Sequence, residues 1–75
     1  MKARNRDTRE AQGLAYIRRN RCASALEIGQ AAIQGEARSR EIPWRAKEAI
    51  GLSIAIELAR KGKVTPTRGN QFRLA

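Results

Sequence analysis

Apolar residues recur at helical spacing in three separate stretches of the chain. The first stretch consists of Ala11, Leu14, Ala15 and Ile17. These positions lie on one side of a helix. We expect this helix to begin at Asp7, because Asp7 and Glu10 have the spacing of a capping box. Asn20 readily takes the left-handed conformation, so it is the predicted end of the helix.

The second stretch follows a short connection, residues 21–23, which is predicted to be extended or irregular. Ser24 and Glu27 then form a second capping-box pattern. The apolar positions that follow are Ile28, Ala31, Ala32 and Ile33. A helix is therefore expected to open at Ser24 and to be ended by Gly35.

The third stretch is the longest. Polar residues 36–41 precede it, and they fit either a loop or a further helical turn. Pro43 suits the first position of a helix, because the N–H that proline lacks would have no partner there. We expect a helix from Pro43 to Lys61, with Gly62 in the left-handed conformation just beyond its end.

The period of the pattern changes near the end of the chain. Val64, Phe72 and Leu74 share one parity, and residues 68–70 between them have the chemistry of a turn. This pattern predicts a β-hairpin with one face on the core. Pro66 cannot donate a ladder hydrogen bond, so the first strand is expected to be short or to lie at an edge.

Helical angles predict that the helices and the hairpin share one core. Its expected members are Leu14, Ile17, Ile28, Ile54, Leu58 and Phe72. Trp44 is predicted to anchor the start of the third helix above this core. Cys22 is predicted to lie at the edge of the core as a small apolar residue. The predicted fold class is mainly α with a small β-hairpin.

The length of 75 residues allows one small domain at most. With one cysteine and no histidine, an internal disulfide is impossible and a Cys/His metal site is not expected. No base for Cys22 and no glycine-rich phosphate loop is visible, so we predict a protein without enzymatic activity or cofactor. The longest apolar run, residues 49–52, is too short to span a membrane, and no secretory signal is visible, which favours a cytoplasmic location.

The charge is strongly positive and unevenly placed. The chain has 16 Lys and Arg residues against 7 Asp and Glu residues, a formal charge of +9. Residues 1–21 carry +5, residues 22–42 carry −1 and residues 43–75 carry +5. Two basic ends indicate an anionic partner, most commonly nucleic acid, although an Arg-rich surface can also serve only solubility. We interpret residues 1–7 as a flexible basic arm and residues 8–75 as one domain.

Four segments together resemble the winged helix-turn-helix domains of bacteria and archaea. Residues 14–20 (LAYIRRN) and 24–28 (SALEI) are similar to the first two helices of that family. Residues 58–64 (LARKGKV) and 68–74 (RGNQFRL) resemble the end of its recognition helix and its wing. The resemblance implies a three-helix core with a short β-wing that binds double-stranded DNA, as in small prokaryotic or phage transcriptional regulators. It also implies that the third helix enters the major groove and that the wing touches the neighbouring backbone.

Two features depart from the family pattern. The segment between the second and third helices, residues 35–42, is longer than the usual tight turn. The third helix is also unusually apolar, since only Ser53 and Glu57 are polar between residues 49 and 59. A helix lying wholly in a major groove needs more hydrogen-bonding groups, so we expect bases to be read by the start of the helix.

Within this interpretation, Arg45 is the best donor for guanine and Lys47 a contact for phosphate. Arg68 lies at the expected wing tip. The full set of expected DNA-binding residues is Lys2, Arg4, Arg6, Trp44, Arg45, Lys47, Arg68, Asn70 and Arg73.

Two other functions stay open. The apolar third helix also fits a protein-interaction module, and the charge also fits RNA or nucleoprotein binding. A second apolar face consists of Leu26, Ile33, Leu52 and Ile56. We expect it either to pack under the N-terminal arm or the long loop, or to form a homodimer or partner surface.

Overall fold

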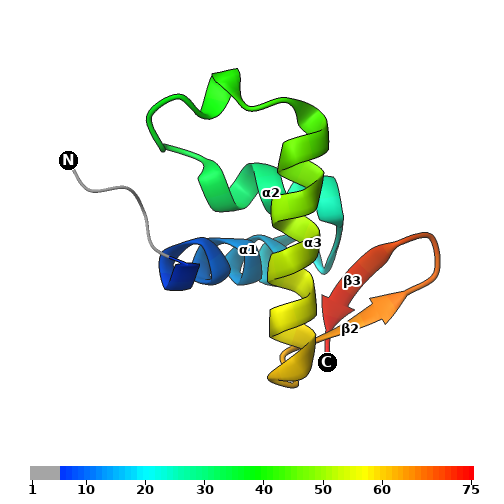
Figure 1. Cartoon of the computed structure of the whole chain (residues 1–75). Coiled ribbons are helices and arrows are strands. Elements are labelled where there is room, and N and C mark those ends of the chain that lie inside the picture. The colour runs from blue at the N-terminus through cyan, green and yellow to red at the C-terminus, as the bar shows by residue number, and fades with distance from the viewer. Residues whose placement is uncertain (1–5) are drawn as a thin grey trace.

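Three helices and a small antiparallel sheet make up the fold (Figure 1). The computed structural model describes residues 6–75, with side chains from Thr8 onward. The helices are α1 (Arg6–Asn20), α2 (Ala25–Ile33) and α3 (Trp44–Arg60), with a 3₁₀ turn at Ser39–Glu41. The strands are β1 (Cys22–Ser24), β2 (Val64–Thr67) and β3 (Gln71–Leu74). The mainly helical fold class and the C-terminal hairpin are therefore confirmed.

The sheet has one strand more than the sequence predicts. Its order is β1-β3-β2, and β3 pairs antiparallel with both neighbours. Phe72 of β3 lies opposite Ala23 on one side and Pro66 on the other. Pro66 is thus in an edge strand, as predicted. The extended alternative for residues 21–23 is confirmed at Cys22 and Ala23, but their pairing with β3 was not predicted, because three residues are too few to show alternation.

The start of α2 is the capping box that the sequence predicts. The Glu27 backbone N–H donates to Ser24 Oγ at 3.2 Å, and the Ser24 N–H donates to Glu27 Oε1 at 2.9 Å. These two bonds satisfy donors that would otherwise lack a partner at the helix start. The capping box therefore fixes where β1 ends and α2 begins.

The end of α3 also follows the prediction. Gly62 has a φ of 75°, in the left-handed region. The Lys63 N–H donates to the Leu58 carbonyl at 2.9 Å, and the Gly62 N–H donates to the Ala59 carbonyl at 3.0 Å. This pair of bonds is the Schellman motif, which turns the chain into β2. At the other end, Pro43 is the N-cap, so α3 begins one residue later than expected.

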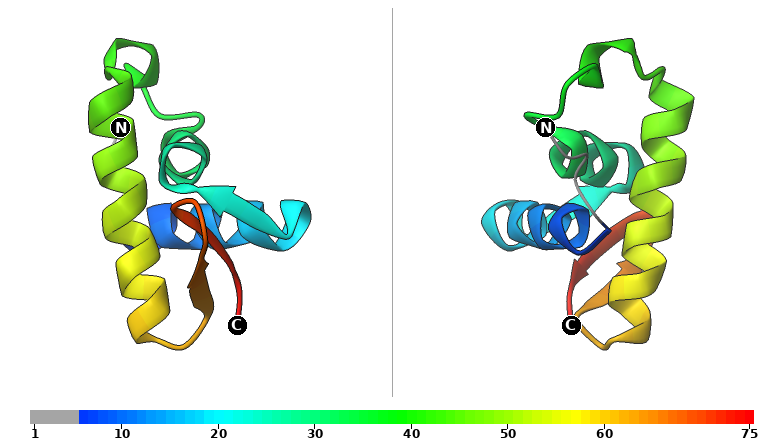
Figure 2. Two further views of the ribbon diagram at one scale, coloured as in Figure 1. Left: turned by 90° about the vertical axis from the view of Figure 1, so that its right-hand side faces the viewer. Right: turned by 60° about the vertical axis from the view of Figure 1, so that its left-hand side comes forward.

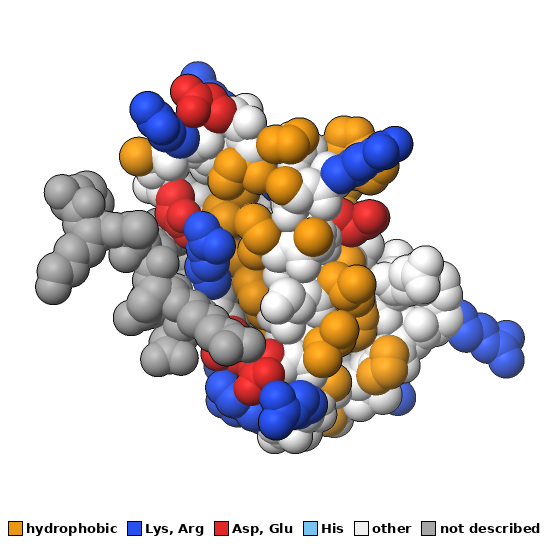
Figure 3. Space-filling model, viewed as in Figure 1, with side chains coloured by type: hydrophobic (Ala, Val, Ile, Leu, Met, Phe, Trp, Pro, Cys, Tyr) orange, Lys and Arg blue, Asp and Glu red, His pale blue; other side chains and the backbone are white. Residues whose placement is uncertain are grey.

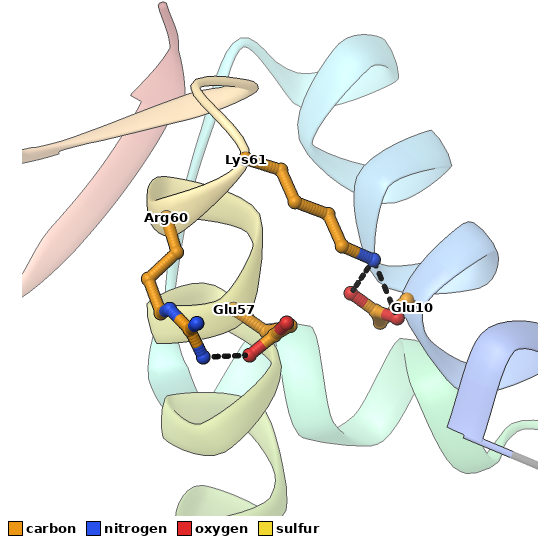
Figure 4. Close-up of polar contacts among 4 residues, drawn as sticks. All are labelled: Glu10, Glu57, Arg60 and Lys61. Atoms are coloured by element: carbon orange, nitrogen blue, oxygen red, sulfur yellow. Dashed lines mark hydrogen bonds and ion pairs between the residues drawn. The ribbon is translucent and has the colours of Figure 1, made fainter.

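Helix α1 ends at Asn20, as predicted, but it begins one residue earlier than expected and its ends are capped differently. Asp7 lies inside α1, and the buried Glu10 accepts hydrogen bonds from Lys61 Nζ at 3.1 and 3.3 Å (Figure 4). Glu10 therefore joins α1 to the end of α3. Arg21, rather than Asn20, takes the left-handed conformation, with φ 71°. The Asn20 side-chain amide instead donates to the Tyr16 carbonyl at 3.0 Å.

The predicted core is confirmed, because all six of its members are buried in one cluster. Two predictions at its margin are wrong. Trp44 is 56% exposed, because the first turn of α3 projects beyond the crossing with α2 (Figure 1). Cys22 is exposed because it alternates along β1 with Ala23, whose side chain faces the core.

The helices cross rather than run side by side. Figure 2 shows α2 nearly end-on beside α3, while the β2–β3 hairpin lies next to the second half of α3. Gly29 of α2 and Gly51 of α3 meet at this crossing. The arrangement leaves the outer side of α3 uncovered along its length.

Candidate functional site

The first turn of α3 presents an exposed cation and an exposed ring. The Arg45 guanidinium carbon lies 5.3 Å from the centre of the Trp44 ring, a distance typical of a cation–π contact. Among residues 8–75, no carboxylate lies within ion-pair distance of Arg45. The structure therefore places Trp44 and Arg45 together at the surface, where both can meet a partner.

The tip of the hairpin presents a second exposed cation. Residues 68–70 form the turn, with φ 75° at Gly69 and 60° at Asn70. Thr67 Oγ1 donates to the Gln71 carbonyl at 3.2 Å, which closes the turn. Arg68 is exposed at this tip and has no ion pair among the described residues. The exposed Arg73 lies further along β3, opposite Cys22 and Thr65.

A groove with a volume of about 330 Å³ lies between α3 and the hairpin. Its lining comes from the start of α2, the first half of α3 and both strands of the hairpin. The residues are Ala25, Glu48, Leu52, Pro66, Thr67, Asn70, Gln71 and Phe72. Because Arg45 precedes Leu52 by seven residues, it lies on the same side of α3. The first half of α3 and the hairpin therefore flank one concave surface.

Lys47 lies on another side of α3. It follows Arg45 by two residues, which turns its side chain by about 200° around the helix. Lys47 is half-buried and lines a separate hollow of about 410 Å³, together with Arg19 from α1 and Arg40 from the 3₁₀ turn. The structure thus separates Lys47 from Arg45 and brings together three cations that the sequence pattern does not connect.

Glu27 supplies a negative charge in this hollow. Its Oε2 accepts a hydrogen bond from the Tyr16 hydroxyl at 3.2 Å, while Oε1 serves the capping box. The hydrogen bond from the Ser24 backbone lowers the pKa of Glu27, against an opposing effect of burial. Burial and the bond to Glu27 raise the pKa of Tyr16, so its hydroxyl stays protonated as a donor. Both carboxylate oxygens of Glu27 therefore already accept hydrogen bonds within the protein.

The outer side of α3 is apolar. Trp44, Leu52 and Ile56 are 56%, 45% and 51% exposed, and Figure 3 shows hydrophobic side chains gathered along this helix. The other two residues of the predicted second face behave differently. Ile33 is buried, with 1% exposure, and Leu26 is half-buried. The prediction that Ile33 offers a partner surface is therefore wrong, and the exposed apolar surface belongs to α3.

The expected basic arm lies largely outside the residues that the structure describes. Lys2 and Arg4 lie outside the described residues. Arg6 and Asp7 belong to α1. Within residues 6–75, no helix has the length and apolar character needed to cross a membrane.

Comparisons with protein-family models, with curated proteins and with solved structures found no match to this chain.

Proposed function

We propose that this protein binds duplex DNA, with the start of α3 in the major groove and the β2–β3 hairpin as a wing on the adjacent backbone. The observation that carries the proposal is the pair Arg45 and Arg68. Both are exposed, neither has a carboxylate partner among the described residues, and they belong to the two elements, α3 and the hairpin, that line the groove between them. The order of three helices followed by a hairpin matches the winged helix-turn-helix resemblance.

The outer side of α3 offers base-reading chemistry in its first half. Arg45 has the fork geometry that binds guanine O6 and N7. Glu48 is exposed and has an acceptor for the cytosine N4 amine, and Leu52 offers an apolar contact for the thymine methyl group. These three residues recur at i, i+3 and i+7, so they face one side. Between Leu52 and Arg60 the exposed positions of α3 are only Ser53 and Ile56, so we propose that only the start of the helix enters the groove.

The hairpin would contribute affinity without sequence preference. Arg68 at the tip and Asn70 beside it can both donate to phosphate oxygens. Arg73 adds charge to the central strand. The formal charge of +9 strengthens attraction to any polyanion at low salt. A small transcriptional regulator, located in the cytoplasm of a prokaryotic cell, is the role that such binding would serve.

The test compares Arg45→Ala and Arg68→Ala by fluorescence anisotropy on selected and random duplexes at several salt concentrations. Loss of Arg45 should weaken the preferred site more than random DNA, by about 1–3 kcal/mol. Loss of Arg68 should weaken all duplexes alike and reduce the salt slope by about one unit.

Arg38→Ala is the matched control, because Arg38 is exposed beside Glu41 on the connection before α3. Arg38→Ala should change neither the affinity for duplex DNA nor its dependence on salt concentration. If Arg45→Ala and Arg68→Ala behave like this control, duplex binding through this surface is ruled out. Equal or tighter binding to RNA hairpins would instead favour the RNA alternative.

The exposed Trp44, Leu52 and Ile56 favour a second candidate function, a protein-interaction module on the same scaffold. Large apolar side chains that gather on one helix face are typical of surfaces that another protein covers. This alternative predicts that DNA affinity stays low even at low salt.

A further inference from the structure

We propose that the outer side of α3 pairs with the same side of α3 in a second copy of this chain, with the two helices antiparallel. The order of charges along the helix indicates that the partner is a second copy of this chain. This pairing does not rest on the proposed DNA binding.

Four residues at intervals of four form a ridge on α3. They are Glu48, Leu52, Ile56 and Arg60. All four are exposed. Two large apolar side chains therefore lie between an acidic residue at one end and a basic residue at the other. Rows of residues at this spacing form ridges that pack into the grooves of a facing helix.

The ridge is complementary to itself only in the antiparallel orientation. Glu48 and Arg60 are equally distant along the helix from the midpoint between Leu52 and Ile56. A two-fold axis at this midpoint therefore places each Leu52 beside an Ile56 of the second copy, and each Glu48 opposite an Arg60. A parallel pairing would instead place Glu48 against Glu48 and Arg60 against Arg60, which is repulsive.

The charges needed for this pairing are available. Within residues 8–75, Glu48 has no cation at ion-pair distance. The Arg60 side chain is 75% exposed, and its Nη1 lies 3.2 Å from Glu57 Oε2 of the same helix (Figure 4). Its other guanidinium nitrogens remain able to donate to a second carboxylate.

The surface beside the ridge has room for the side chains of a second copy. Small residues Ala49 and Ser53 form the adjacent row, and they line a groove of about 390 Å³ between α1 and α3. Together with Leu52 and Ile56, they make the four-residue hole that accepts one side chain of a facing helix. Ile56 of the second copy fits this hole under the same two-fold symmetry.

Pairing and base reading use the same residues. Glu48 and Leu52 belong to both surfaces, so one α3 cannot do both at once. A duplex that carries the preferred site should therefore shift the protein toward the monomer. By the same competition, self-pairing should lower the apparent affinity for DNA.

Sedimentation velocity of the full chain without DNA, over a wide concentration range, measures the pairing. The wild type should show a reversible monomer–dimer equilibrium. Glu48→Arg alone and Arg60→Glu alone should each raise the dimer Kd by about tenfold. An equimolar mixture of the two variants should restore dimers, because each chain then supplies the charges that the other needs.

The matched controls are Glu41→Arg and Arg38→Glu. They reverse an exposed pair of the same kind, with a 3.7 Å separation, away from α3. Both should dimerise like the wild type. Ile56→Ser should abolish pairing while thermal unfolding followed by circular dichroism stays near that of the wild type.

A wild type that stays monomeric at every concentration would overturn the proposal, as would a mixture that fails to restore dimers. The outcome is separable from that of the DNA proposal. Arg68→Ala should lower duplex affinity and leave the dimer unchanged, because Arg68 lies in the hairpin. Ile56→Ser should abolish the dimer and leave duplex binding dependent on Arg68.

Discussion

Gly29 of α2 and Gly51 of α3 let the two helices approach each other closely. A Cβ placed on Gly29 would lie 1.8 Å from the Lys47 carbonyl oxygen, and a Cβ placed on Gly51 would lie 1.7 Å from the Ala25 carbonyl oxygen. The obstacles are backbone atoms, so a side chain at either position would force the helices apart. Because both glycines lack a side chain, the backbones of α2 and α3 can come into direct contact at the crossing.

Gly51→Ala should lower the free energy of unfolding by about 3 kcal/mol. Alanine favours a helix over glycine by about 1 kcal/mol, so helix propensity alone would make Gly51→Ala stabilising. A loss of stability would therefore show the effect of the close contact between α2 and α3. Urea denaturation measures it. Ser53→Ala, an exposed position in the same helix, is the control and should be neutral or slightly stabilising. A Gly51→Ala variant as stable as the wild type would mean that the helices are not in close contact.

Leu58→Ala should cost about 2–5 kcal/mol, because Leu58 is 2% exposed in the centre of the core. Leu52→Ala removes the same atoms from the same helix at a position that is 45% exposed. It should cost less than about 1 kcal/mol. Thermal melts at low protein concentration, which disfavours the proposed dimer, compare the two. Equal losses would show that the inner and outer sides of α3 are wrongly assigned.

Glu27 should make stability depend on acid pH. Its pKa is lowered in the folded state, chiefly by the hydrogen bond from the Ser24 backbone. Its contribution to stability is therefore complete above the ordinary pKa of glutamate and is lost as pH falls from there through the lowered value of the folded state. Urea midpoints across this range should fall more steeply for the wild type than for Glu27→Gln. If the urea midpoints of the two proteins fall equally with pH, Glu27 is not the cause of the pH dependence.

The two ion pairs of Figure 4 should differ in their contribution to stability. The Glu10 side chain is 8% exposed, so Lys61→Met leaves a buried carboxylate without its partner and should cost about 1–3 kcal/mol. The double variant Glu10→Gln/Lys61→Met should recover part of this loss. Arg60→Ala breaks an exposed pair and should cost about 0.5 kcal/mol or less. Unfolding by urea tests all three, and a Lys61→Met loss as small as that of Arg60→Ala would be the contrary result.

Local signals in the sequence predict those parts of the fold that depend on local chemistry. The Ser24 capping box and the Gly62 stop are confirmed because each needs only residues within a few positions. The apolar spacing also identified Ile54 and Leu58 as core residues. By contrast, the exposure of Trp44 depends on where α2 crosses α3, which no local pattern contains.

One part of the candidate site depends on how distant segments come together, and another part follows from helical spacing alone. Arg19 and Arg40 join Lys47 only because α1, the 3₁₀ turn and α3 converge in space. The separation of Lys47 from Arg45, however, was visible in the sequence, because residues two apart on a helix face different sides. The ridge from Glu48 to Arg60 was likewise readable from its interval of four.

The position of β3 has a consequence for how the sheet can open. β3 is the central strand of the sheet, yet it follows all three helices along the chain. Loss of pairing at Gln71 to Leu74 would therefore unpair β1 and β2 together, because these two strands do not pair with each other. Such edges are templates for pairing with other chains. Fraying of this one strand would open two strand edges at once, so the pairing of β3 with both neighbours is what protects the sheet against aggregation.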